Sequence, residues 1–242
     1  MKISTGIATV VVVALLASAL SACGGGSSSL ATTPATTSFD MQTGITGLVM
    51  NGQTATVTLS GTAIGSGGSV PFTGTGTLTL APGVTATFNG AGALSQIESI
   101  SGTVTAAGQT APYSSSVTDF YATGNDAFVG EIGTSEYDVA QAPFTYPTAV
   151  MAGSSGVLGT TSNYTDSTMG VAQGMTQVSY AVTAVSGSSS SVMVAVTDQV
   201  YDTQGTLVET DVTNYSLTDA GVLSLVSASV QNSAGTLTVT VQ

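Results

Sequence analysis

Threonine alternates with small or branched apolar residues along much of this chain. In residues 54–59 (TATVTL) the apolar side chains fall on one face and the threonines on the other, and residues 84–88 and 236–241 repeat the pattern. A period of two is typical of a β-strand with one face buried and one face in water. We find no convincing period of 3.6 over ten residues after residue 23, so the sequence predicts an all-β protein.

Turn signals separate the alternating segments. Gly and Asn tolerate the positive φ angles that tight hairpin turns require. Strands joined by such short turns pair antiparallel, so we expect antiparallel strands with hairpin meanders, arranged as a sandwich or as two small β units. The signals are Asn51-Gly52, Pro82-Gly83, Asn89-Gly90, Ala107-Gly108 and Gly124-Asn125-Asp126.

A short repeat near the C-terminal end predicts three further hairpins. Gly205, Gly221 and Gly235 are each followed by a β-branched residue and then a leucine. These glycines are spaced 16 and 14 residues apart. With Gly supplying the positive φ, the repeat indicates a meander of strands of about six residues.

Composition changes near the middle of the chain. All six Phe residues precede residue 145, and all eight Tyr residues follow residue 112. The segment 143–147 (PFTYP) interrupts any strand ladder, because Pro lacks the backbone donor. We therefore expect one β unit at 39–145 and another at 146–242, with one continuous two-sheet body as the alternative.

The first 23 residues have the features of a bacterial signal peptide. A short segment with Lys2 precedes an apolar run from Ile7 to Leu20, and its 14 residues are too few to span roughly 30 Å of hydrocarbon as a helix. The run ends in Leu20-Ser21-Ala22-Cys23, which resembles the lipobox of bacterial lipoproteins. The resemblance is confined to these 23 residues.

The lipobox resemblance implies a processed, membrane-anchored protein. It implies removal of the signal peptide (1–22) and lipidation of Cys23, whose acyl chains bind the membrane stably. Residues 23–38 then form a flexible Gly/Ser/Thr-rich linker. Gly24, in the place of an Asp, resembles lipoproteins sorted to the outer membrane, so we expect an outer-membrane anchor with the protein facing the periplasm or the cell surface.

Charge excludes several classes of function. Lys2 is the single basic residue against 13 acidic residues, and the chain has no His. Without a basic patch we expect no nucleic-acid partner. Nucleophilic catalysis lacks its usual base, so we expect no enzyme activity, no catalytic residues and no cofactor. With Cys23 lipidated, the single Cys leaves no disulfide.

Two groups of acidic residues are the candidate metal ligands, because calcium binds oxygen ligands. No EF-hand pattern is present, and Asp and Glu are common in turns and on solvated faces, so we predict no metal site. The first group is Asp119, Asp126, Glu131, Glu136 and Asp138, and the second is Asp198, Asp202, Glu209 and Asp211.

The turn at residues 202–205 decides whether the second group converges. A two-residue loop pairs Asp198 with Glu209 and places all four acids on one face. A three-residue loop ending at Gly205 pairs Asp202 with Thr206, which separates Asp198 from Glu209 and Asp211. Gly205 suits the longer loop, and directly opposed carboxylates are destabilising, so we predict that these acids do not converge.

The function expected from these patterns is that of a lipid-anchored cell-envelope protein, working as a non-enzymatic binding or structural module. A self-assembling or adhesin-like surface component is the alternative, because the mature chain has no Lys to protect its edge strands. An integral outer-membrane barrel is disfavoured by the lipobox, the absence of Trp, the final Gln242 and short strands.

The same sequence offers two further candidate functions. A carboxylate enzyme would need two acids converging in one cleft. Sugar binding would use tyrosines in strand-like segments, for which we expect packing at the core edge with the hydroxyl in water. These tyrosines are Tyr113, Tyr121, Tyr137, Tyr164, Tyr180, Tyr201 and Tyr215.

Overall fold

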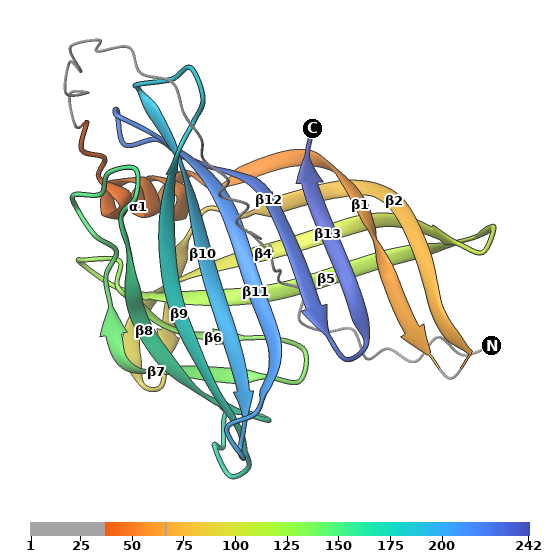
Figure 1. The fold of residues 1–242 in the computed structure, drawn as a ribbon. Helices are drawn as coiled ribbons and strands as arrows, with labels where there is room; N and C mark the ends of the chain where they lie inside the picture. The colour runs from red at the N-terminus through yellow and green to blue at the C-terminus, as the bar shows by residue number, and fades with distance from the viewer. Residues whose placement is uncertain (1–36, 66) are drawn as a thin grey trace, which may run out of the picture.

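The computed structural model describes residues 37–65 and 67–242, which form one helix, α1 (Met41–Asn51), followed by thirteen strands (Figure 1). The predicted signal peptide, Cys23 and most of the predicted linker lie outside these residues. The strands are β1 (Gln53–Gly65), β2 (Gly68–Leu80), β3 (Val84–Phe88), β4 (Ala91–Ala106), β5 (Gln109–Ala122), β6 (Phe128–Ile132), β7 (Tyr137–Phe144), β8 (Ser155–Tyr164), β9 (Ala172–Ala184), β10 (Ser191–Asp202), β11 (Leu207–Thr218), β12 (Leu223–Asn232) and β13 (Gly235–Val241).

The strands form one antiparallel sheet that closes on itself. Each strand from β4 to β12 pairs with the next, β13 pairs with β1, β1 with β2, and β2 with β4. This ring is a 12-strand barrel, and β3 pairs with β4 beyond the end of β2. The prediction of an all-β, antiparallel protein is confirmed, and the sheets close into a barrel in place of the expected sandwich.

The sheet is continuous across the boundary predicted after residue 145. That boundary falls between β7 and β8, and these strands pair with each other from Tyr137 opposite Tyr164 to Ala140 opposite Thr161. The β units expected at 39–145 and 146–242 thus contribute strands to the same barrel.

Most turns lie where the sequence predicts them, but Asn51-Gly52 ends α1 and does not join two strands. Ala107 and Gly108 have φ angles of 48° and 76° in the β4–β5 hairpin, and Gly205 and Gly221 have φ angles of 78° and 75°. The prediction of six-residue strands is wrong, since β11 has 12 residues. A tight turn uses only a few residues, so most of the spacing between two turns is strand.

The prediction that no helix follows residue 23 is wrong for α1. Asp40 caps its N-terminus, where Oδ1 accepts a hydrogen bond from the backbone N of Thr43 at 2.9 Å. Buried residues at 41, 44, 45, 48 and 49 follow the helical period. Two glycines and two threonines weaken the intrinsic preference for helix, so packing against the barrel stabilises this segment. No helix in the described part of the chain is long and apolar enough to cross a membrane.

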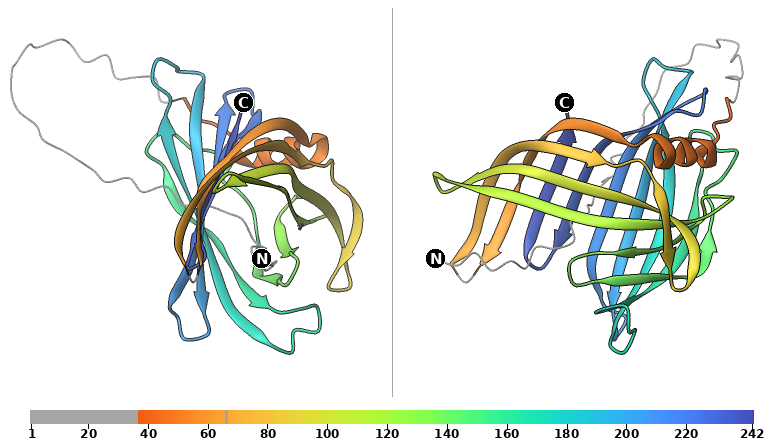
Figure 2. Two further views of the ribbon diagram at one scale, coloured as in Figure 1. Left: turned by 90° about the vertical axis from the view of Figure 1, so that its right-hand side faces the viewer. Right: turned by 180° about the vertical axis from the view of Figure 1, so that it is seen from behind.

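Helix α1 lies across one end of the barrel, at the top in Figure 1 and in both views of Figure 2. Gln96 of β4 donates from Nε2 to the carbonyl oxygen of Leu48 at 3.0 Å, and Gly83 N donates to the carbonyl oxygen of Val49 at 2.7 Å. Met41 is fully buried and Val49 is 1% exposed. The helix therefore closes this end with apolar side chains.

The two faces of the sheet differ in chemistry. On β1, Val57 and Leu59 point inward and are each 1% exposed, whereas Thr54 and Ser60 are exposed on the outside. The apolar core thus lies inside the barrel beneath α1. A second, smaller cluster of Phe88, Ala93, Phe120 and Tyr137 lies apart from this core.

Candidate functional site

The barrel contains a partly open cavity of about 160 Å³ beyond the apolar core. Its wall comes mainly from alternate residues of β4 to β11, because the pleat of a strand directs every second side chain inward. Seven of the thirteen acidic residues of the chain line it: Glu98, Asp119, Glu131, Glu136, Asp138, Asp198 and Asp211. Residues 37–65 and 67–242, which the structure describes, contain no basic residue.

Three of these acids form a row across neighbouring strands. Asp119 of β5 is the direct cross-strand partner of Glu131 of β6, and Glu131 is in turn the partner of Asp138 of β7. We call these three residues the acidic row. Like charges directly opposite one another destabilise a sheet. The acidic row therefore destabilises the barrel unless protons or a bound cation neutralise its charge.

A second pair of acids meets on β10 and β11. The loop at Gly205 is the predicted three-residue loop, since Asp202 N donates to the carbonyl oxygen of Thr206 at 2.9 Å. A bulge then shifts the register between Val200 and Tyr201, and beyond it Asp198 lies directly opposite Asp211.

The prediction that the acids of this segment do not converge is therefore wrong. The three-residue turn is as predicted, but Val208 is an extra residue in β11. The resulting bulge moves every residue of β11 beyond it by one position relative to β10. A slip of one residue exchanges the two faces of a strand, and a bulge has no clear signature in this sequence.

Neutral polar side chains join the acidic row to the Asp198–Asp211 pair. Thr161 and Asn163 of β8 are each buried, and Thr161 Oγ1 donates to Asn163 Oδ1 at 3.0 Å. Asn163 Nδ2 donates to Thr176 Oγ1 of β9 at 2.8 Å. Nothing in the sequence assigned these three residues to a common site, because hydroxyl and amide residues are so common along the chain.

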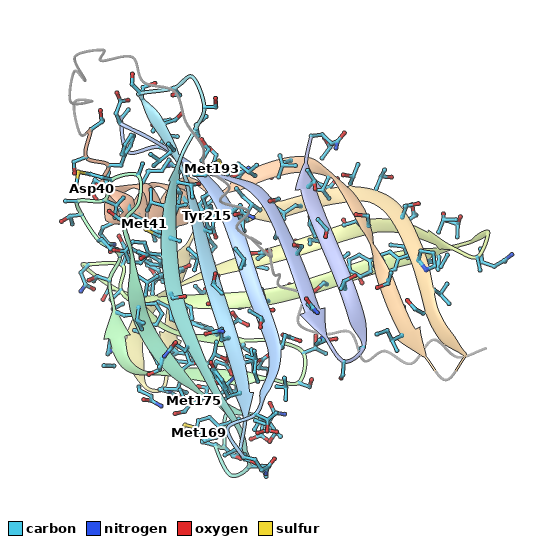
Figure 3. The ribbon with its side chains drawn as sticks, viewed as in Figure 1. Asp40, Met41, Met169, Met175, Met193 and Tyr215 are labelled. Atoms are coloured by element: carbon cyan, nitrogen blue, oxygen red, sulfur yellow. The ribbon has the colours of Figure 1, made fainter. Side chains whose placement is uncertain are left out.

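Aromatic rings line the same cavity as the acids. Tyr121, Tyr146 and Tyr215 contribute to the wall together with Phe128 and Phe144. The Phe128 and Phe144 rings stack with centroids 5.1 Å apart, and Tyr121 meets Phe128 edge-on at 5.9 Å. Figure 3 labels Tyr215 on β11, with Met41 at the α1 end and Met169 at the opposite end.

The tyrosines differ from the sequence expectation in two respects. We expected their hydroxyls in water, but Tyr121 is 6% exposed, and the Tyr113 hydroxyl is buried without a hydrogen-bond partner among the described residues. Tyr146, which no sequence pattern singled out, lines the same cavity.

Burial raises the pKa of six acids in the cavity, which are Glu98, Asp119, Glu131, Asp138, Asp198 and Asp211. Desolvation, with repulsion from Asp119 as the next cause, raises the pKa of both Glu98 and Asp198 to about 7. Desolvation and repulsion from Glu209 and Asp198 raise the pKa of Asp211 to about 11. The pKa values of Glu131 and Asp138 are also raised, mainly by burial.

Three carboxylate oxygens of the cavity accept no hydrogen bond. They are Oδ1 of Asp138, Asp198 and Asp211, all buried and without a partner in the described part of the protein. Asp138 and Asp211 are only 7% and 3% exposed. Leaving a buried acceptor unsatisfied costs about 1–3 kcal/mol, and more when it is charged. These oxygens are therefore the positions where a donor from a bound molecule would be most favourable.

Other predicted acids lie elsewhere. Asp126 accepts a hydrogen bond from Thr46 of α1 at 2.7 Å, and Asp202 caps its own turn by accepting from the backbone of Gln204 and Thr206. Glu209 accepts from Asn232 at 2.6 Å and is absent from the cavity wall. In residues 37–65 and 67–242 no three acidic side chains come close enough to ligate one metal ion.

Comparison of the chain with protein-family models, curated proteins and solved structures finds no match. The chemistry of the site is therefore derived from the lining side chains alone.

Proposed function

We propose that this protein is a lipid-anchored, non-enzymatic binding module of the cell envelope whose barrel holds a small molecule in its interior. The observation that carries the proposal is the partly open cavity with seven acidic side chains, three of which have unpartnered, buried oxygens. Pockets that combine apolar walls with a few convergent polar groups are the usual sites for small ligands.

The anchor rests on the lipobox at Leu20–Cys23 and on the Gly/Ser/Thr-rich linker that follows. The outer face of the barrel agrees with a tethered position. Outward positions of β2 carry Thr73, Thr75, Thr77 and Thr79, whereas the partners facing inward are Gly or Leu. A barrel that spans a bilayer carries an apolar band on its outer face, and the threonines of β2 would interrupt such a band. These threonines support the proposal that the barrel lies beside the outer membrane, in the periplasm or at the cell surface.

Self-assembly through strand edges has less support. That alternative depended on unprotected edges in a chain without Lys, and closure of a sheet removes its edges. Pairing of β2 with β4 completes the ring, and β3, which has only β4 as a partner, is five residues long.

An acid–base enzyme is the second candidate, because the acids do converge. Glu98 and Asp198 both line the cavity with pKa values raised to about 7, a range suited to proton transfer near neutral pH. A described wall without any basic side chain offers little stabilisation for a developing negative charge. Turnover of chromogenic glycosides by the full-length protein, abolished by Asp198→Asn, would favour this candidate over binding alone.

The binding proposal is tested by filling the cavity. Ser115 of β5 lines the cavity, whereas its neighbour Ser114 is exposed on the outer face. We would screen the full-length protein with small molecules for a rise in melting temperature, which reports binding to the native state. The expected rise occurs in wild type and in Ser114→Trp and disappears in Ser115→Trp. An equal rise in all three proteins, or no rise with any compound, would contradict the proposal.

A further inference from the structure

The acidic cavity lacks a counter-charge from the protein itself. Residues 37–242 contain no Lys, Arg or His, so no described side chain can form an ion pair with the carboxylates. Two of the three unpartnered oxygens belong to the opposed pair Asp198 and Asp211, and the third belongs to Asp138 at the end of the acidic row. Buried carboxylates need hydrogen-bond donors, and a cationic donor also cancels their repulsion.

The carboxylates form two centres. Asp198 and Asp211 lie on β10 and β11, while the acidic row lies on β5 to β7, and β8 and β9 separate the two along the sheet. Asp119 and Glu136 repel Asp198, so the centres are within electrostatic reach of each other. A ligand with one cationic group compensates one centre only, whereas a ligand with two compensates both.

The wall of the same cavity also carries surface that suits a short organic chain. Tyr146 and Tyr215 line the cavity, and Val178 and Val196 add apolar surface to the same wall. Tyrosine rings attract an ammonium group through their faces, and valines pack against methylenes. A volume of about 160 Å³ greatly exceeds the 10–15 Å³ that one water needs, yet it falls short of the range of roughly 300–1,000 Å³ that is usual for drug-sized ligands.

The arrangement fits an organic cation better than a metal ion. Calcium takes six to eight oxygens around one point. Among the described residues no group of three acids is close enough to ligate one metal ion. An ammonium group needs only two or three acceptors, which an opposed pair of carboxylates supplies.

We propose that the ligand of this cavity is a short aliphatic diamine. One ammonium group binds between Asp198 and Asp211, the other binds the acidic row through Asp138, and the methylenes lie against the tyrosine and valine side chains. This inference rests on the proposed binding function and assigns the chemical class of the ligand.

The experiment is calorimetric titration of the full-length protein with putrescine and cadaverine. Butylamine, which has one ammonium group, and pentanediol, which has none, are the matched probes. We expect the diamines to bind at least tenfold more tightly than butylamine and pentanediol not to bind. Calcium chloride is titrated in parallel, and tighter binding of calcium than of either diamine would overturn the proposal.

Variants locate the ligand. Asp198→Asn and Asp138→Asn each remove one charge from a different centre, and both should weaken cadaverine binding at least tenfold. Asp219→Asn is the control, because Asp219 is an exposed residue outside the cavity and its loss changes the net charge equally. If one cavity variant fails to fold, the other variant and the comparison of diamine with monoamine still decide the question.

The pH dependence gives an independent readout. Asp198 faces Asp211 of β11, Asp119 of β5 and Glu136 between β6 and β7. Because these carboxylates must lose protons to bind a dication, diamine affinity should rise from pH 6 to pH 8, while the amines stay charged.

The experiments distinguish a failure of the diamine proposal from a failure of the proposed binding function. Absence of diamine binding overturns the inference. If another compound then binds to wild type but not to Ser115→Trp, the binding function stands with a ligand of a different class. If no compound depends on Ser115, the proposed function fails as well.

Discussion

Asp198 and Asp211 are direct cross-strand partners inside the barrel, and each leaves its Oδ1 atom without a hydrogen bond. Two carboxylates in this position repel each other when both are charged. The barrel therefore tolerates the pair either by holding protons on it or by binding a cation. Both possibilities make stability and binding depend on pH.

The free energy of unfolding should fall as pH rises from about 4 to about 9. An acid with a raised pKa keeps its proton in the native state at pH values where the unfolded chain has already released it. Between the pKa of the unfolded chain and the pKa of the native state, each rise in pH therefore lowers the free energy of unfolding. The relevant pKa values are about 7 for Glu98 and Asp198 and about 11 for Asp211. Urea denaturation at several pH values measures the slope. A stability that increases with pH over this range would show that the acids are not buried as described.

Replacing Asp211 with Asn should stabilise the protein at high pH. The Asn side chain does not titrate, so its contribution to the free energy of unfolding does not fall as pH rises. We expect this free energy to increase on the order of 2–4 kcal/mol at pH 9 and to change by about 1 kcal/mol or less at pH 4. Asp219→Asn, in the exposed β11–β12 turn, should change stability by less than about 0.5 kcal/mol at either pH. Equal effects of the two variants at pH 9 would argue against a special environment for Asp211.

The two glycines of α1 should respond oppositely to alanine. A Cβ at Gly47 meets no atom within 4 Å, whereas one at Gly44 lies 2.9 Å from Leu223 Cβ and 3.1 Å from Leu217 Cδ1. Gly47→Ala should stabilise by about 0.5–1 kcal/mol through helix propensity. Gly44→Ala should destabilise by about 1–3 kcal/mol through overpacking. Chemical denaturation of both variants checks the contact of α1 with the barrel, and a gain for Gly44→Ala would refute it.

A Cβ at Gly130 of β6 would overlap the carbonyl oxygen of Asp138 on β7 and the ring of Phe88, which stacks on Phe120 with centroids 4.6 Å apart. Gly130→Ala should therefore displace Phe88 and cost about 2–4 kcal/mol, whereas Gly92→Ala, which has open space around it, should cost little. Melting temperatures of the two variants make the comparison. If Gly130→Ala melts like wild type, Phe88 does not pack against β6.

The anchor is tested by Cys23→Ala. Loss of the sulfur removes the site of lipidation, so the variant should leave the detergent phase in which the wild-type protein partitions. Mass spectrometry of the mature N-terminus measures the lipid directly. Detergent partitioning like wild type would mean that the lipobox resemblance is misleading.

The strands and most hairpin turns could be predicted from the sequence alone. Alternation with Thr predicted the strands, and Gly205, Gly221 and Gly235 predicted their hairpins, because the pleat and positive φ impose requirements on individual residues. Helix α1 was also encoded locally, in Asp40 as the cap and in the apolar spacing that begins at Met41, but its glycines obscured the pattern.

The cavity was decided by the tertiary structure. Closure depends on the pairing of β2 with β4, a contact between strands separated by β3. Convergence of Asp198 with Asp211 depends on a bulge, which reverses the faces beyond Val200. The sequence by itself determined the strand pattern, most turns and the excess of acidic over basic residues. Only the closed barrel determined which acids share one interior, because register and closure are set by packing over the whole sheet and not by neighbouring residues.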